Sequence, residues 1–294
     1  MDGQPVAVVI PTRVGWPHMR RSVDAVLPQV HELGGRLVVA DASGLPPPEL
    51  AADPAVQWLE LPGRPGYELR QAAYRAASAP IVAVTEDHCA PAADWLAQLV
   101  AEHERRPDAA VVYGTVANGS PEHLIDWALF GVGYLSWAPP EPEKRGNPGH
   151  ANLAFKSWVF ERRPPVGDEV LEFRYVAALR EAGYEVVASP LPRVTHFQSA
   201  GLPATSTLFF HNGRAIAGLR RQRMAGMDWL RLAAPALIAG YRTLRTMRVA
   251  RTKPDLEPAI LRSAALIALL HLCHAYGESV GYLGGPGDSA THLH

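Results

Sequence analysis

The sequence is poor in cysteine, with Cys89 and Cys273 as the only two among 294 residues. Two cysteines so far apart offer no disulfide framework, so a reducing compartment is the simpler expectation. No basic segment with a long apolar run and a small-residue cleavage site precedes the strand-like residues 6–10, so export is not expected. These absences predict a cytoplasmic protein.

Long apolar runs and a strong net charge are missing too. In the C-terminal part the longest uncharged runs cover residues 232–241 and 263–277, and both are shorter than the roughly 18 apolar residues of a spanning helix. The net charge of −1 argues against a general nucleic-acid-binding protein. It conceals an asymmetry, because residues 1–205 hold 17 Lys and Arg against 24 Asp and Glu, whereas residues 206–294 hold 11 against 5. The tail is therefore basic and the rest of the chain acidic.

What is present is the pattern of an α/β domain. Apolar residues make up 48% of the chain, which is enough to fill a core. Residues 6–10, 37–40 and 81–84 are short, β-branched and unalternating, as strands of a parallel sheet covered on both faces should be. Residues 20–33 and 68–77, with apolar side chains at helical spacing, separate these runs. The order predicts a doubly wound, mostly parallel sheet flanked by helices.

Later segments extend this pattern and then change it. A helix predicted over residues 171–182 ends at Gly183, a residue type suited to the left-handed position that closes a helix. From about Thr205 onward the sequence turns into long helical stretches rich in Ala, Leu and Arg. We therefore predict an α/β domain over residues 1–205 and a helical appendage over residues 206–294.

Polar residues follow three of the predicted strands. The first is followed by Pro11-Thr12-Arg13, the second by Asp41-Ala42-Ser43 and the third by Glu86-Asp87-His88. Ligands of open parallel sheets bind beyond the carboxyl ends of the strands, so these groups should meet at one site. The Gly-x-Gly-x-x-Gly fingerprint of dinucleotide-binding proteins is absent after the first strand, which argues against an oxidoreductase.

These segments resemble glycosyltransferase family 2, whose members have the GT-A fold. Residues 6–12 look like the opening strand of that family and residues 37–43 like its second strand. Arg70 lies sixteen positions before Glu86, which is the spacing between the family's Ala-Arg-Asn-x-Gly and Asp-x-Asp motifs. Three later blocks extend the resemblance over about two thirds of the chain: residues 149–155, Leu171-Glu172 and Val194-Thr195-His196.

The resemblance implies an inverting transfer of a sugar from a nucleotide-diphosphate sugar to an envelope, lipid-linked or polysaccharide acceptor. It assigns Asp41 to the nucleoside, Arg70 to its vicinity or to a phosphate, and a divalent metal to the donor diphosphate. Glu172 is the implied general base, with Asp168 or Glu169 in its place if the loop before the helix registers differently. The residues expected to bind the nucleotide sugar are Pro11, Thr12, Arg13, Asp41, Arg70, Glu86, Asp87 and Asn152.

The sequence departs from the family's Asp-x-Asp motif, which is replaced here by Glu86-Asp87-His88. From the resemblance we expect Asp87, His88 and His196 to hold Mn²⁺ or Mg²⁺. Imidazole nitrogens suit Mn²⁺ better than Mg²⁺, so Mn²⁺ is the favoured ion in vitro.

Other interpretations stay open at single residues. Asp41 could serve only the turn after its strand, and His196 could be a partly buried structural histidine. The cluster of His271, Cys273 and His274 scatters around a helix, which favours packing over metal binding. Four aromatic residues could line a sugar-binding platform or form a helix core: Trp127, Phe130, Tyr134 and Trp137.

Two other functions compete with glycosyl transfer. A nucleotidyltransferase would also bind a nucleotide and a metal at the ends of parallel strands, but residues 11–15 are poorer in glycine than its basic loop should be. A non-catalytic nucleotide-binding or membrane-scaffold protein would have kept the fold and lost the metal site. The altered acidic motif favours that second rival.

The basic tail predicts a surface that docks on an anionic membrane. Arg242, Arg245 and Arg248 recur every three residues and share a predicted helix with the apolar residues Leu237, Tyr241, Leu244 and Met247. Docked on the cytoplasmic face of a membrane, this helix would present the site to a lipid-linked or envelope-bound acceptor. Alternatively, the helices of the tail pack on the catalytic domain or form a homo-oligomer.

Overall fold

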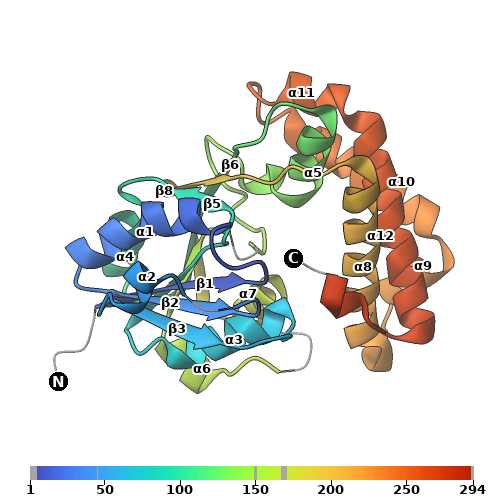
Figure 1. Ribbon diagram of the computed structural model, residues 1–294. Coiled ribbons are helices and arrows are strands. Elements are labelled where there is room, and N and C mark those ends of the chain that lie inside the picture. Colours follow the sequence, from blue (N-terminus) through green and yellow to red (C-terminus); the bar gives the residue numbers. More distant parts are fainter. Residues whose placement is uncertain (1–4, 45, 149–150, 167–170, 293–294) are drawn as a thin grey trace. The chain divides into compact units, whose positions relative to one another are not determined.

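The computed structural model describes residues 5–44, 46–148, 151–166 and 171–292 (Figure 1). The chain forms two compact units. The first, here called the sheet unit, comprises residues 1–117 and 139–197, and the second, the helical unit, comprises residues 118–138 and 198–293. The helical unit thus takes in a segment from the middle of the chain as well as the C-terminal residues.

An eight-stranded mixed sheet forms the centre of the sheet unit, in the order β3-β2-β1-β4-β7-β6-β8-β5. Its parallel half consists of β1 (Val6–Thr12), β2 (Arg36–Asp41), β3 (Val56–Glu60) and β4 (Ile81–Val84). The other half consists of β7 (Leu153–Lys156), β6 (Ala109–Asn118), β8 (Glu185–His196) and β5 (Cys89–Pro91). In this half β7 runs antiparallel to β4 and β6, and β5 runs antiparallel to β8.

Helices cover both faces of the parallel strands, as the unalternating apolar runs predict. Figure 1 shows α1 (Arg20–Glu32) and α3 (Gly66–Ala76) on opposite faces of β1 and β2. The helix α3 buries Leu69 and Ala73 against Val9 and Val38 of the sheet. The remaining helices of this unit are α2 (Pro48–Ala51), α4 (Trp95–Arg105), α6 (Trp158–Arg162) and α7 (Glu172–Glu181). The α/β fold with a C-terminal helical region is therefore confirmed.

The end of α7 agrees with its sequence signal. Gly183 has φ +86°, the left-handed conformation in which a side chain would be strained. The amide of Tyr184 donates to the carbonyl of Leu179, and the amide of Gly183 donates to that of Arg180. These bonds satisfy carbonyls that the helix end would otherwise leave without a partner.

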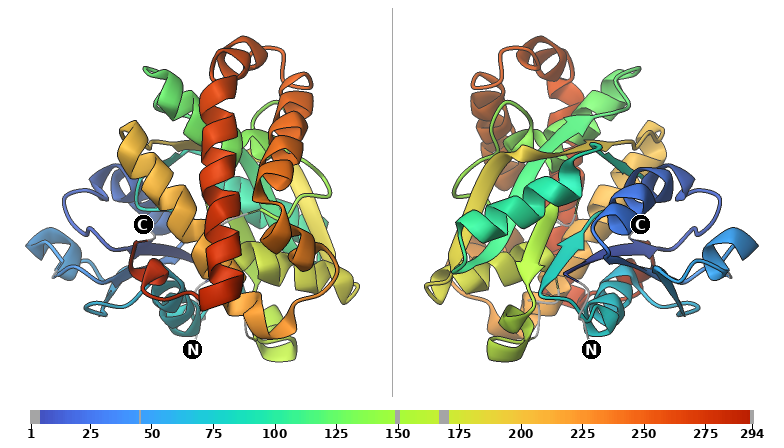
Figure 2. Two further views of the ribbon diagram at one scale, coloured as in Figure 1. Left: turned by 90° about the vertical axis from the view of Figure 1, so that its right-hand side faces the viewer. Right: turned by 90° about the vertical axis from the view of Figure 1, so that its left-hand side faces the viewer.

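The helical unit is built around one long helix, α12 (Ala264–Gly284), which lies between α8 (Leu202–Arg220) and α10 (Pro235–Ala250) (Figure 2). Its backbone touches that of α8, because a Cβ at Gly277 would lie 2.0 Å from the carbonyl oxygen of Phe210. The other elements of the helical unit are α5 (Leu124–Gly133), η1 (Leu135–Trp137), η3 (Arg221–Arg223), α9 (Met227–Ala233), α11 (Glu257–Arg262) and η4 (Ser289–His292). Within the described residues, no helix is both long and apolar enough to cross a membrane.

The aromatic residues of the middle segment belong to this unit. Phe130 on α5 is 1% exposed, and Trp127, Tyr134 and Trp137 are partly buried. The ring of Phe130 meets Trp127 edge to face and stacks on Tyr134. Phe130 therefore belongs to a helix core, the second of the two interpretations given above.

A buried carboxylate joins the helices of this unit. Glu278 on α12 lies 2.8 Å from Arg242 of α10, and longer ion pairs reach Arg220 of α8 and Arg231 of α9. Burial by itself would raise the pKa of Glu278, but His274 and the nearby Arg242 hold that pKa at about 2. Arg242, with 23% of its side chain exposed, is therefore engaged in an ion pair within the helical unit, whereas Arg245 and Arg248 on the same helix are exposed.

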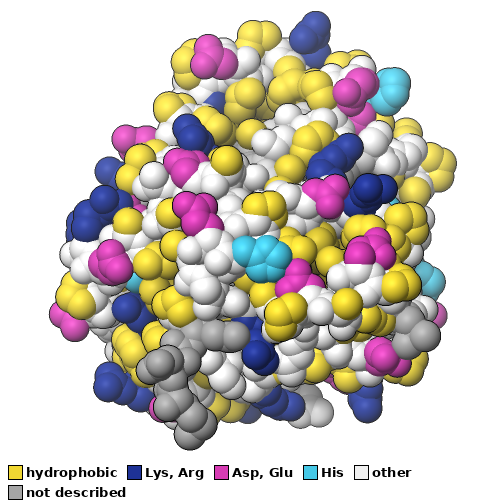
Figure 3. All heavy atoms as spheres, turned by 60° about the vertical axis from the view of Figure 1, so that its left-hand side comes forward, with side chains coloured by type: hydrophobic (Ala, Val, Ile, Leu, Met, Phe, Trp, Pro, Cys, Tyr) yellow, Lys and Arg dark blue, Asp and Glu magenta, His cyan; other side chains and the backbone are white. Residues whose placement is uncertain are grey.

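Basic and acidic side chains are interspersed over the face of the molecule drawn in Figure 3. This distribution agrees with the small net charge of −1.

Candidate metal and nucleotide site

The predicted site residues meet where the parallel strands end. Thr12 is the last residue of β1 and pairs in register with Asp41, the last residue of β2. Both side chains are almost fully buried. Glu86 follows β4 by two positions, and β4 is the other neighbour of β1. The carboxyl ends of three adjacent strands therefore bring these residues to one edge of the sheet.

Asp41 shapes the turn that follows β2. Its Oδ1 accepts hydrogen bonds from the amide and the hydroxyl of Ser43, both at 2.7 Å, and its Oδ2 accepts one from the amide of Gly44 at 3.2 Å. Gly15, with φ +65°, packs on this turn, because a Cβ there would lie 2.0 Å from Ser43 Oγ. The turn role considered for Asp41 is thus present, and its contact with a nucleoside stays a prediction.

Asp87 is held between Thr12 and His88. Its Oδ2 accepts a hydrogen bond from the Thr12 hydroxyl at 2.7 Å, and its Oδ1 lies 2.7 Å from His88 Nδ1. Burial opposes the charge of Asp87, but the bonds from His88 and Thr12 outweigh it and lower the pKa of this carboxyl. A carboxylate can only accept, so Nδ1 of His88 must donate. In a neutral ring this leaves Nε2 of His88 with the lone pair that a metal would need.

His88 and His196 face each other across the site. Their Nε2 atoms are 2.9 Å apart, and Glu86 Oε2 lies 3.4 Å from His196 Nε2 and 3.7 Å from His88 Nε2. Ligand atoms about 2.1 Å from one ion are about 3 Å apart when they take adjacent corners of an octahedron. These three donor atoms therefore fit a single Mn²⁺ ion, with Asp87 fixing the ring of His88 from behind.

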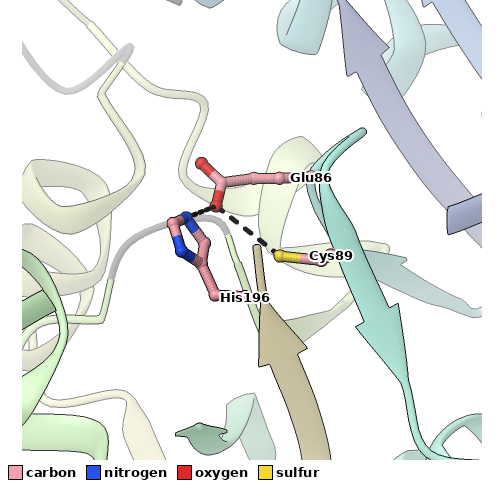
Figure 4. A group of neighbouring side chains, drawn as sticks. All are labelled: Glu86, Cys89 and His196. Atoms are coloured by element: carbon pink, nitrogen blue, oxygen red, sulfur yellow. Dashed lines mark hydrogen bonds and ion pairs between the residues drawn. The ribbon is translucent and has the colours of Figure 1, made fainter. Parts of the chain in front are cut away.

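Cys89 is a member of this cluster that the sequence analysis did not assign. It pairs in register with His196 through the β5–β8 ladder, and its Sγ lies 3.8 Å from Glu86 Oε2 (Figure 4). Burial, together with the charge of Glu86, raises the pKa of this thiol well above its ordinary value. The one sequence feature that could have indicated Cys89 is its position three residues after Glu86. This spacing indicates a shared site only when the pairing of Cys89 with His196 is known.

A second group of predicted residues meets between α3 and α7. Glu172 is 3% exposed, and its Oε1 accepts a hydrogen bond from the Tyr74 hydroxyl at 2.8 Å and lies 3.3 Å from Arg70 Nε. The structure therefore pairs the two residues that the family resemblance assigns to base and donor binding. Asp168 and Glu169, the alternatives to Glu172, lie outside the described residues.

Asn152 has internal partners for its amide group. Its Nδ2 donates to the carbonyls of Thr115 and Pro192, and its Oδ1 accepts from Trp95 Nε1 at 2.8 Å. Asn152 is 2% exposed and directly precedes β7, so these hydrogen bonds connect the start of β7 to β6, β8 and α4. Asn152 thus has a structural role, and its contact with a donor stays a prediction.

The N-terminal half of the chain matches a known family. Residues 7–162 match the model of glycosyl transferase family 2, which is more than half of the chain. The chain belongs to glycosyltransferase family 2. The family predicted from the sequence blocks is confirmed. None of the curated proteins is significantly similar to this chain in sequence.

Solved structures of glycosyltransferases are similar to this chain. The mannosyltransferase PcManGT from Pyrobaculum calidifontis, in complex with GDP-Man and Mn²⁺, has a TM-score of 0.56 and 18% identity, covering 95% of this chain and 87% of that one. GalNAc-T7 with UDP, GalNAc and Mn²⁺ has a TM-score of 0.49 and 16% identity over 67% of this chain, which spans only 44% of the GalNAc-T7 chain. Glucosyl-3-phosphoglycerate synthase from Mycobacterium tuberculosis has a TM-score of 0.48 and 16% identity, covering 68% and 73% of the two chains. The likeness to PcManGT confirms the GT-A-like fold.

Proposed function

We propose that the protein transfers a sugar from a nucleotide-diphosphate sugar to a carbohydrate or lipid-linked acceptor in a metal-dependent reaction. The observation that supports this best is the convergence of Glu86 and His88, which follow the parallel strand β4, with His196 at the end of β8. Membership of glycosyltransferase family 2 supports the same reaction.

In this proposal Glu86, His88 and His196 hold Mn²⁺, with Mg²⁺ as the weaker alternative because of the two imidazoles. A bound divalent ion supplies positive charge that offsets the charge developing on the departing diphosphate. Asp87 orients His88, and the Thr12 hydroxyl orients Asp87. The role proposed for Asp87 is thus to position a ligand, where the sequence alone suggested a ligand.

The donor nucleotide is proposed to lie along the ends of β1 and β2. There Pro11, Thr12 and Arg13 border the turn that Asp41 holds together. Arg70 is assigned to the nucleoside or to a phosphate. It lies on α3, one helix that covers these two strands.

Glu172 is the proposed general base of an inverting reaction. Its ion pair with Arg70 requires a carboxylate, which is the form that can accept a proton from an acceptor hydroxyl. Its position at the first turn of α7 fixes the direction of the side chain, and Tyr74 restrains the same oxygen.

We expect a panel of nucleotide sugars to reveal at least one donor from which the protein releases nucleoside diphosphate when Mn²⁺ is present. Omitting the ion or adding a chelator should remove that release. A nucleotidyltransferase would instead release pyrophosphate from a nucleoside triphosphate. Absence of both turnover and donor binding would favour a non-catalytic scaffold.

The acceptor is proposed to be lipid-linked or part of the cell envelope, reached by peripheral docking on the cytoplasmic face of a membrane. Three apolar residues on one face of α10 are largely exposed, Leu237 at 64%, Tyr241 at 62% and Leu244 at 60%. Arg245 and Arg248 on the same helix are exposed as well. Apolar side chains beside arginines suit the interface of an anionic membrane.

Liposome flotation tests this docking. We expect the protein to float with vesicles that contain anionic lipid, and salt should weaken the binding. Replacing both Arg245 and Arg248 by Gln should lower the affinity about 30-fold, since each basic residue near the surface contributes about 1 kcal/mol. Arg20→Gln with Arg106→Gln, on the sheet unit, is the matched control. Equal, negligible binding to neutral and anionic vesicles would leave the tail as a folding or dimerisation element.

A further inference from the structure

The metal cluster offers two overlapping sets of donor atoms. One is the set of Glu86, His88 and His196 described above. The other contains sulfur, because a carboxylate oxygen of Glu86, Sγ of Cys89 and a ring nitrogen of His196 all lie within 4.8 Å of one another. In Figure 4 the Glu86 carboxylate is joined by dashed lines to both His196 and Cys89. Glu86 and His196 thus belong to both sets.

The backbone fixes this second set. The amide of Cys89 donates to the carbonyl of Glu86 at 3.1 Å, which closes the turn between the two residues. The β5–β8 ladder then places Cys89 directly opposite His196. All three side chains are buried, so few rotamers are open to them. The set is therefore preformed by a turn and a strand pair.

We propose that Glu86, Cys89 and His196 form a Zn²⁺ site that overlaps the Mn²⁺ site and inhibits the enzyme when filled. Four-coordinate Zn²⁺ accepts sulfur, nitrogen and oxygen ligands, whereas Mn²⁺ prefers oxygen and nitrogen. Zn²⁺ also binds a given set of ligands more tightly than Mn²⁺ does. On binding, the Cys89 thiol gives its proton to solvent as the zinc–sulfur bond forms.

Zn²⁺ and Mn²⁺ exclude each other because both need the Glu86 carboxylate oxygen and the His196 imidazole. Zn²⁺ bound through Cys89 would engage Glu86 and His196, and His88 would then lack its two co-ligands for Mn²⁺. Only this inhibitory consequence rests on the proposed function. The zinc site itself rests on the geometry of the three side chains.

The helical unit contains the other cysteine, and its neighbours are engaged elsewhere. His271 Nε2 lies 3.1 Å from the Thr246 hydroxyl. His274 Nδ1 lies 2.9 Å from Arg242 Nη1 and 3.7 Å from Glu278 Oε2, so this ring nitrogen already faces two polar partners. Cys273 is therefore the weaker candidate for a metal–sulfur bond and serves as the control.

Co²⁺ is the spectroscopic probe for this site, because a bond between Co²⁺ and a thiolate gives a charge-transfer absorption band in the near ultraviolet. The Cys273→Ser variant of this sequence has Cys89 as its only thiol. We expect wild type and Cys273→Ser to develop the band equally when Co²⁺ is added, and Cys89→Ser to lack it. Absence of the band in Cys273→Ser would overturn the proposal, and this result does not depend on whether Cys89→Ser folds.

Metal affinities give the second test. In competition with a chromophoric chelator, Cys89→Ser should bind Zn²⁺ at least ~100-fold more weakly than Cys273→Ser, since it lacks a direct ligand. Its affinity for Mn²⁺, followed by electron paramagnetic resonance, should change by less than ~10-fold, because Cys89 is outside that set. An equal loss of affinity for both ions, or no loss of affinity for Zn²⁺, would refute the sulfur-containing site.

The outcomes separate this proposal from the proposed function. A protein that shows the Co²⁺–thiolate band but turns over no nucleotide sugar keeps the zinc site and loses the glycosyltransferase assignment. An enzyme that is active with Mn²⁺ but shows no such band loses only the zinc site. If the zinc site and the glycosyltransferase activity are both present, micromolar Zn²⁺ should inhibit Mn²⁺-dependent turnover by Cys273→Ser. A chelator selective for zinc should restore that turnover.

Discussion

Replacing either His88 or His196 by alanine is expected to lower Mn²⁺-dependent release of nucleoside diphosphate by at least ~100-fold. Each variant removes one of the two nitrogens that lie 2.9 Å apart, so one imidazole and Glu86 are all that remains of the set. A metal contributes several kcal/mol to stabilising a developing charge, and 1.36 kcal/mol corresponds to tenfold in rate. The measurement is turnover as a function of Mn²⁺ concentration with a donor found in the panel.

The control for these variants is His18→Ala, which removes an exposed histidine of the sheet unit. It should leave turnover and its Mn²⁺ dependence unchanged. The midpoints of thermal unfolding of all three variants should agree closely if the losses of turnover arise at the site and not from unfolding. Near wild-type turnover in both His88→Ala and His196→Ala would contradict the metal assignment.

Asp87→Asn separates a positioning role from a ligand role. The amide that replaces the carboxylate can still meet Thr12, but it holds His88 less firmly because it has lost its charge. If Asp87 only orients His88, the apparent affinity for Mn²⁺ should fall by about 10–100-fold, and high Mn²⁺ should restore turnover. If turnover stays low at saturating Mn²⁺, Asp87 takes part more directly than we propose.

Most of the parallel half of the sheet follows from local sequence. Apolar β-branched runs and amphipathic spacing are properties of neighbouring residues, so β1, β2, β4, α1 and α3 could be predicted from them. The antiparallel half depends on distant partners. The strand β5 has three residues, and it is a strand only because β8 pairs with it about a hundred positions later. No local pattern encodes that pairing.

The site shows the same division. The order of polar residues after β1, β2 and β4 predicted the cluster of Thr12, Glu86 and Asp87, since the topology of a parallel sheet fixes which strand ends meet. The geometry around His196 needed the structure. Its position opposite Cys89 and 2.9 Å from His88 depends on the register of the β5–β8 ladder, and a shift of one residue would turn it to the other face.

The helical unit could not be delimited from composition. The change of pattern near Thr205 marks long helices, but residues 118–138 also belong to this unit although they lie between two strands of the sheet. Their α5 is almost wholly apolar and could have been a core helix of either unit. Contacts of Gly131 with Ile260 and Ile267 settle its place, and such contacts over more than a hundred positions have no local signal.

Glu172→Gln is expected to lower turnover at saturating donor by roughly 10²–10⁴-fold, the range that general acid–base catalysis contributes. Glutamine keeps the shape of the side chain and can still accept a hydrogen bond from Tyr74, but it cannot take a proton from an acceptor hydroxyl. The base acts on the acceptor, so the dissociation constant of the donor should change little. Turnover and donor binding are measured on the same preparations.

The competing explanation is that Glu172 only ties α7 to α3 through Arg70 and Tyr74. Tyr74→Phe is the matched control, because it removes the hydrogen bond and leaves the carboxylate and its ion pair in place. A general base predicts a large loss of turnover in Glu172→Gln and a small one in Tyr74→Phe, with the folded fraction of each variant checked by urea unfolding. Comparable losses in the two variants, or a collapse of donor affinity in Glu172→Gln, would mean that Glu172 acts through its contacts with α3, and Asp168 or Glu169 would then be the next bases to replace.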